Sequence, residues 1–164
     1  MNIKFYTELA NRILVQIPDL DRLAERALLS WSRAKESSDD EQLYLESVAL
    51  NLHGFYSGLE RIFELIGKHI DRTIPEGDMW HFELLQQMSK EIQEIRPAVI
   101  SEGVVPSLDE LRRFRHLVRN VYSFNLLPDK IELLVDDLSG LWSQVRAEVL
   151  AFAELLSQMS KKAD

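Results

Sequence analysis

The stretch Asp40–Arg72, DEQLYLESVALNLHGFYSGLERIFELIGKHIDR, carries apolar side chains at the spacing of a helix. Those that would face a core are Leu45, Val48, Leu52, Phe55, Leu59, Ile62, Phe63, Ile66 and Ile70. A stripe sustained over this length is typical of a long helix in a bundle. Gly54 and Gly58 lie within it, and each costs about 1 kcal/mol against alanine. We interpret them as a groove for a closely packed neighbour, either another helix of the same chain or a helix of a second subunit.

Two helices are predicted before this stretch. The first covers Asn2–Ile17 and ends at Pro18, because proline lacks the amide hydrogen that a helix interior needs. Asp19 caps the second helix, which reaches about Ala34 and carries its apolar residues on one face. The link between them is short, so we expect an N-terminal antiparallel helical hairpin over residues 1–36.

Another helix is predicted after residue 72. The turn Thr73–Asp78 precedes it, and its apolar face extends from Trp80 to Ile95. The Arg96-Pro97 pair should end it, because the residue before a proline disfavours helical geometry.

The remaining chain predicts two more helices. Ser107 and Glu110 have the spacing of a capping box at the start of the first. After a turn at Leu126–Pro128, a last long helix extends to about Met159. No segment has the alternation of a β-strand. The sequence therefore predicts an all-α fold, an up-and-down helical bundle with four core helices over residues 40–159.

The composition restricts the class of protein. At 164 residues the chain is long enough for one domain, residues 1–164, with a substantial core. It has no cysteine, which excludes disulfides, thiol catalysis and cysteine-bound metals. A net charge of −8 argues against broad coating of nucleic acid but allows a local cationic site. No apolar run has membrane-spanning length and no signal peptide is recognised, so we expect a soluble, cytoplasmic protein.

Neither a metal site nor a cofactor site is predicted. The metal sites of helical bundles use Glu-x-x-His pairs, and the chain has none. His53, His69 and His81 lie on separate predicted segments or turns without ligand spacing. A glycine-rich phosphate loop and a serine-nucleophile motif are also absent from the sequence. We interpret Trp80 and His81 as a core aromatic residue with a polar neighbour.

The segment Arg112–Tyr122, RRFRHLVRNVY, holds four arginines and no acidic residue. On a helix, Arg112, Arg115, Arg119 and His116 occupy one arc, and the apolar side chains occupy the opposite arc. An Arg115/Arg119 pair suits a phosphate, because guanidinium groups bind phosphate in a bidentate fork.

Three further side chains of this segment suit chemistry on RNA. His116 titrates near neutrality and could act as an acid or base toward a ribose 2′-hydroxyl or a leaving oxygen. Asn120 could orient the site, and Tyr122 would place a phenol at its rim. The plainer interpretation is that these arginines are solvated or paired with carboxylates of neighbouring helices, since the chain has 27 acidic residues. The chain would then be a helical adaptor.

The same segment resembles the motif of the HEPN superfamily, and more narrowly that of the HepT-like ribonuclease toxins. Their signature is an arginine, a polar neighbour, a histidine four to six residues further on and often a tyrosine two residues beyond. Here Arg115 and His116 match the first two positions, Asn120 stands where the family has histidine, and Tyr122 matches the tyrosine. Histidine and asparagine are thus exchanged. Phe55–Gly67 is similar to the first core helix of the family, and the likeness covers roughly residues 40–159.

The resemblance implies a function and roles for the residues. Members of this family are metal-independent endoribonucleases that pair as homodimers, with both arginine helices facing a shared cleft. The partner antitoxin is commonly a minimal nucleotidyltransferase that adds AMP to the motif tyrosine, here Tyr122. In an RNA complex, Arg115 would stabilise the phosphate, His116 would transfer protons and Asn120 would orient the site. Arg112 and Arg119 would assist in phosphate binding. Because the motif departs from the usual order, the alternative is a non-catalytic HEPN-like module that binds a nucleotide or a partner protein.

Overall fold

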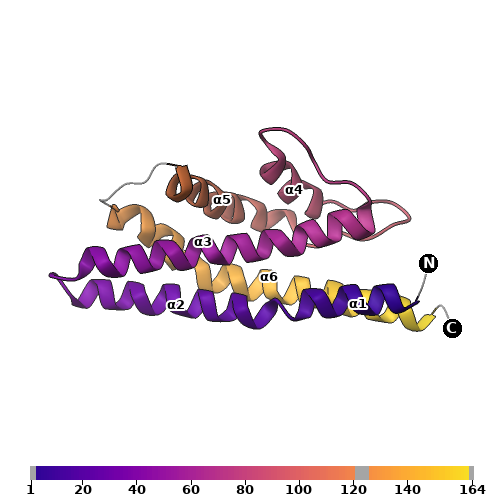
Figure 1. Ribbon diagram of the computed structural model, residues 1–164, viewed down its shortest axis with the longest axis horizontal. Helices are drawn as coiled ribbons and strands as arrows, with labels where there is room; N and C mark the ends of the chain where they lie inside the picture. The colour runs from indigo at the N-terminus through magenta and orange to yellow at the C-terminus, as the bar shows by residue number, and fades with distance from the viewer. Residues whose placement is uncertain (1–2, 121–125, 163–164) are drawn as a thin grey trace.

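The computed structural model describes residues 3–120 and 126–162, except for the side chains of residues 119 and 120. The described residues form helices joined by loops and turns (Figure 1). These are α1 (Ile3–Leu14), α2 (Ile17–Glu36), α3 (Glu41–Ile66) with a π-helical extension η1 (Gly67–Asp71), α4 (Trp80–Met88), a 3-10 turn η2 (Glu102–Val104), α5 (Val105–Asn120) and α6 (Pro128–Lys162). Within these ranges β-structure is limited to an isolated bridge between Ile92 and Arg96. The predicted all-α bundle is confirmed.

The predicted N-terminal hairpin over residues 1–36 is wrong, because α1 and α2 lie end to end along one edge of the molecule (Figure 1). Only Val15 and Gln16 separate the two helices, and this link does not reverse the chain. Helical hydrogen bonding continues across this link, where the Val15 amide donates to the Asn11 carbonyl at 3.0 Å. Pro18 lies in the first turn of α2, where a missing amide hydrogen costs nothing.

The antiparallel pair is instead α2 with α3, and the two glycines of α3 explain its close packing. A Cβ atom built on Gly58 would lie 2.8 Å from the Leu20 Cδ2 atom, and one on Gly54 would lie 3.4 Å from Leu23. Both leucines belong to α2. The neighbour predicted for the glycine groove is therefore a helix of the same chain. The first 36 residues are part of the core, since α2 buries Leu20 and Trp31 in it.

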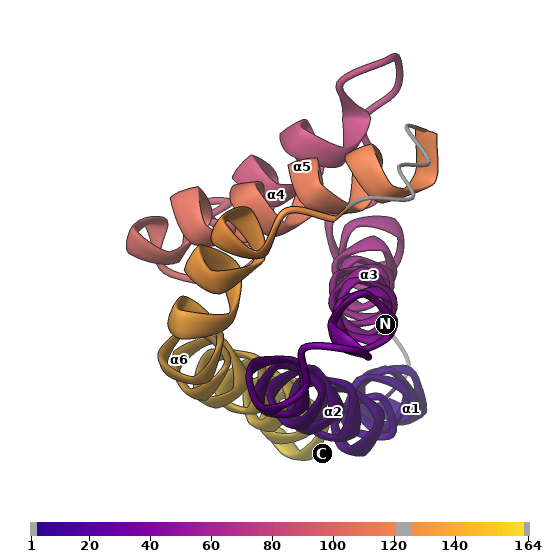
Figure 2. The ribbon, with the colours of Figure 1, turned by 90° about the vertical axis from the view of Figure 1, so that its left-hand side faces the viewer.

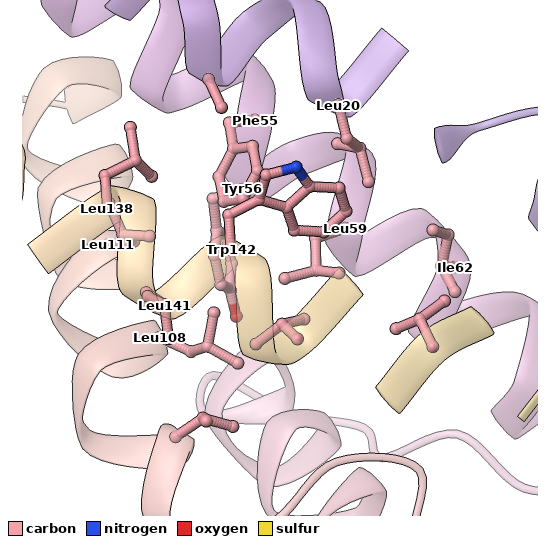
Figure 3. Packing of buried hydrophobic residues seen from close by; sticks show 14 of the residues in the cluster. Leu20, Phe55, Tyr56, Leu59, Ile62, Leu108, Leu111, Leu138, Leu141 and Trp142 are labelled. Atoms are coloured by element: carbon pink, nitrogen blue, oxygen red, sulfur yellow. The ribbon is translucent and has the colours of Figure 1, made fainter. Parts of the chain in front are cut away.

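The long helix α6 completes the core. It packs along α1 and also contacts α2, α3 and α5. The Trp142 ring meets the Phe55 ring edge-on, with 5.2 Å between centroids (Figure 3). Its indole nitrogen donates to Asp21 on α2 at 2.8 Å, and Arg146 binds the same carboxylate. The hydrogen bond from Arg146 is the main reason why the pKa of Asp21 lies below its ordinary value.

The helix α4 is shorter than predicted, because tertiary contacts use its C-terminal end. It ends at Met88, whose carbonyl accepts hydrogen bonds from the amides of Val99 and Ile100 as the chain returns. Ile95, predicted on the inner face, is 46% exposed.

Arg96 anchors the connection that follows α4. Its Nε donates to Asp71 Oδ1 at 2.5 Å and its Nη2 donates to Oδ2 at 2.7 Å. Its other N–H groups donate to the carbonyls of Gln87, Lys90 and Pro97. Both side chains of the ion pair are at most 2% exposed. All five guanidinium donors are satisfied, which is what makes a buried arginine tolerable.

Together, α4 and α5 lie on one side of α3, while α1 and α2 lie on the other (Figure 2). The helix α5 begins at Val105, so Ser107 lies inside it and the predicted capping box with Glu110 does not form. No helix in the described ranges is both long and apolar enough to cross a bilayer.

Candidate functional site

A hollow of about 360 Å³ lies where α5 meets α4 and the turn before it. Its lining residues are Gly77, Asp78, Trp80, His81, Arg112, Arg115 and His116. Three of them belong to the arginine segment, whose residues 112–120 lie in α5, and the apolar side chains of Leu111 and Phe114 on the same helix are buried. The arc of Arg112, Arg115 and His116 expected from helical spacing is therefore present at one site.

Arg115 is held by a buried carboxylate. Its Nη1 lies 3.4 Å from Glu60 Oε1 on α3, and the two side chains are 15% and 4% exposed. The Nε of Arg115 is buried and has no hydrogen-bond partner among the described residues. The guanidinium is thus internally paired, as the plainer interpretation expected, yet it keeps donor capacity at the hollow.

The second oxygen of the same carboxylate binds a histidine of α4. His81 Nδ1 lies 2.8 Å from Glu60 Oε2. The Trp80 ring covers the imidazole, with 3.6 Å between the two centroids. Both residues are half-buried and line the hollow, and Trp80 packs at the margin of the core instead of inside it.

Arg112 and Arg113 share another carboxylate, that of Asp109, and diverge from it. Arg112 Nε donates to Asp109 Oδ1 at 2.7 Å, and its guanidinium lies 5.5 Å from the centre of the Phe82 ring. Arg113 binds the other oxygen of Asp109 and also Glu110. Hydrogen bonding to Asp109 raises the pKa of Arg113. Arg113 lines a groove between α5 and α6, so it lies outside the hollow.

Two other titratable residues of α3, Tyr56 and Glu64, lie near Glu60 and have raised pKa values. Tyr56, one turn before Glu60 on α3, points its phenol into the core, and that hydroxyl lacks a partner within the described residues (Figure 3). Burial, reinforced by the Glu60 charge, raises the pKa of Tyr56. Partial burial likewise raises the pKa of Glu64, with a further contribution from Glu60. The Glu60 charge therefore acts on Tyr56 and Glu64 as well as on Arg115 and His81.

Three predicted site residues lie wholly or partly outside the described residues. The side chains of Arg119 and Asn120, and the whole of Tyr122, lie outside the described residues. As for metals, the part of the chain that the structure describes has no group of three or more His, Cys, Asp or Glu residues placed to hold an ion.

A family model described as HepT-like protein matches residues 47–156, which include most of α3, all of α4 and α5, and most of α6. The chain belongs to the HepT-like family of the HEPN superfamily. A search of curated proteins and a search of solved structures each returned no match. In this HepT-like chain, α1 and α2 lie outside the matched region although they complete its core.

Sequence reasoning about this HepT-like chain missed Glu60 and His81. A signal existed for Glu60, because it shares a helical face with Tyr56 and Phe63, and a carboxylate on a buried face needs partners. No comparable signal existed for His81. Its contact with Glu60 depends on how α4 crosses α3, which local sequence patterns do not specify.

Proposed function

We propose that this chain is a metal-independent endoribonuclease and the toxin component of a HEPN/nucleotidyltransferase toxin–antitoxin system. One observation carries the proposal: in a HepT-like chain, Arg112, Arg115 and His116 line one hollow on the surface. Two guanidinium groups beside an imidazole suit the binding of a phosphodiester and the transfer of a proton to or from it.

The proposed reaction uses the RNA's own 2′-hydroxyl as nucleophile. A base removes the hydroxyl proton while the oxygen bonds to the adjacent phosphorus, and an acid protonates the departing 5′-oxygen. The products are a 2′,3′-cyclic phosphate and a 5′-hydroxyl. Arg115 and Arg112 would stabilise the charge that develops on the phosphorus oxygens, and His116 would transfer a proton. Asn120 and Arg119 are assigned orienting and phosphate-binding roles by their motif positions.

The family likeness extends the proposal to partners and place. The chain would act in the cytoplasm as a homodimer whose two α5 helices face a shared cleft that binds single-stranded RNA. A minimal nucleotidyltransferase would be the antitoxin and would silence the toxin by adding AMP to Tyr122. No cofactor is required by this chemistry.

The test is cleavage of single-stranded RNA by the purified protein in the presence of EDTA. We expect cleavage by the wild type, with Arg115→Ala and His116→Ala reducing it by about 10²–10⁴-fold. Arg113→Ala is the matched control, because it removes an arginine from the same helix outside the hollow. Cleavage at the wild-type rate by an Arg115→Ala/His116→Ala double variant would contradict the assignment.

The alternative is a non-catalytic HEPN-like module that binds a nucleotide or partner protein through the same face. The pairing of Arg112 with Asp109 and of Arg115 with Glu60 favours it, because such pairing lowers the attraction for a phosphate. This module would bind nucleotide with an affinity that falls with salt, would leave RNA intact, and would cause no growth arrest on overexpression.

A further inference from the structure

We propose that His81 is the general base of this site and that Glu60 is its positioning residue, an assignment that rests on the endoribonuclease function proposed above. His81 lies outside the arginine segment, on α4, and lines the same hollow. The hollow thereby holds two imidazoles, those of His81 and His116. Cleavage with a 2′-hydroxyl nucleophile needs two proton-transfer groups, one for each oxygen.

The contact with Glu60 sets the chemical form of the His81 ring. Glu60 is 4% exposed, and its carboxylate oxygen accepts a hydrogen bond from His81 Nδ1 at 2.8 Å. A ring that donates from Nδ1 carries its lone pair on Nε2 when neutral. The His81 side chain is 27% exposed at the hollow, so this lone pair is within reach of a bound substrate. A carboxylate that orients a histidine in this way is a recurrent device of acid–base catalysis.

The same carboxylate also fixes the distance between base and phosphate site. Glu60 Oε1 contacts Arg115 and Glu60 Oε2 contacts His81, so one rigid, buried group positions both. The Trp80 ring against the imidazole further restricts rotation of the ring. A base held at a fixed place beside the phosphate-binding arginine suits attack by a 2′-hydroxyl on that phosphate.

The reaction also needs an acid for the leaving oxygen, and His116 takes this role. Neutral His81 takes the proton of the 2′-hydroxyl, and the 2′-oxygen forms a bond to phosphorus. The bond from phosphorus to the 5′-oxygen breaks, and that oxygen receives a proton from protonated His116. The cyclic phosphate and the 5′-hydroxyl leave, and water exchange returns both imidazoles to their starting forms.

The pH profile separates this role from a merely structural one. The charged and titratable groups near His81 are Glu60 and Glu64 on α3, Arg112, Arg115 and His116 on α5, and Asp78 before α4. The wild-type kcat/KM for a short single-stranded RNA should fall at acidic pH as the base is protonated. In His81→Ala we expect kcat about 10²–10⁴-fold lower, loss of that acidic limb, and partial recovery with added imidazole.

Two further variants keep the test decisive. His69→Ala removes an imidazole outside the hollow and should leave rate and profile unchanged. Glu60→Gln retains an oxygen that can accept from Nδ1 but loses the charge, so kcat should fall without a rise in KM and the acidic limb should move. Circular dichroism and urea midpoints establish that each variant is folded.

The outcomes separate the two proposals. If the wild type does not cleave RNA, the endoribonuclease function fails, and the assignment of His81 fails with it. If the wild type cleaves and folded His81→Ala cleaves at the same rate with the same pH profile, only the assignment of His81 is overturned. A rate lost in proportion to folded protein, with no imidazole recovery, would also overturn it.

Discussion

Replacing Glu60 by glutamine should make the hollow bind phosphate more tightly. The substitution keeps the shape of the side chain but removes a negative charge that is 4% exposed and lies 3.4 Å from Arg115 Nη1. In the wild type, any anion that binds Arg115 is repelled by this carboxylate. Glutamine removes the carboxylate that contacts Arg115, so a phosphate becomes a stronger partner for the arginine.

The size of this gain in phosphate affinity follows from the distance across the Arg115 guanidinium. A phosphate on the outer donors of Arg115 would lie about 6 Å from the Glu60 carboxylate, which gives a repulsion of about 3 kcal/mol at an effective permittivity of 20 and about 0.7 kcal/mol in water. The hollow is open to solvent, so the effective value should lie between these limits. A gain of about 1.4 kcal/mol corresponds to about tenfold tighter binding.

Calorimetric titration at low ionic strength measures this change, with inorganic phosphate and with an oligonucleotide that lacks the attacking 2′-hydroxyl. Glu60→Gln should bind both ligands about tenfold more tightly, and added salt should reduce the difference. Glu83→Gln on α4 is the matched control, because it removes the same charge from an exposed position outside the hollow and should change affinity less than about twofold. Unchanged or weaker binding by folded Glu60→Gln would refute the placement of the anion on Arg115.

Three further predictions concern stability, each measured by urea unfolding. Arg96→Ala should cost about 3–5 kcal/mol, because it leaves the Asp71 carboxylate buried without its cation; a cost below about 1 kcal/mol would contradict this. Gly58→Ala should cost about 1–2 kcal/mol through its clash with α2, whereas Gly140→Ala, with open space around the new Cβ, should stabilise by up to about 1 kcal/mol. The pKa of Asp21 is lowered in the folded state from an ordinary value of 3.8, so its contribution is present above that pH and is lost as pH falls through the folded value. The unfolding midpoint of Asp21→Asn should therefore lose less than that of the wild type between pH 7 and pH 3.

Local patterns predicted most of the helices but not how they end. The stripe from Leu45 to Ile70 predicted α3 and its extension, because burial of an apolar face requires helical periodicity. The end of α4 could not be predicted, since it depends on the chain returning to Met88 and on a buried ion pair with Asp71. Pro18 does not end a helix as predicted, because proline is equally compatible with the first turn of a helix, and it lies in the first turn of α2.

Local sequence likewise determines one part of the candidate site, and tertiary packing determines the other. That Arg112, Arg115 and His116 share one face was determined by the sequence alone, because residues three and four apart on a helix are neighbours. That a buried Glu60 holds Arg115 with one oxygen and His81 with the other was decided only by the crossing of α3, α4 and α5. Helical periodicity is a local property of the chain. The meeting of three helices depends on long-range packing, and here that packing determines which side chains could do chemistry together.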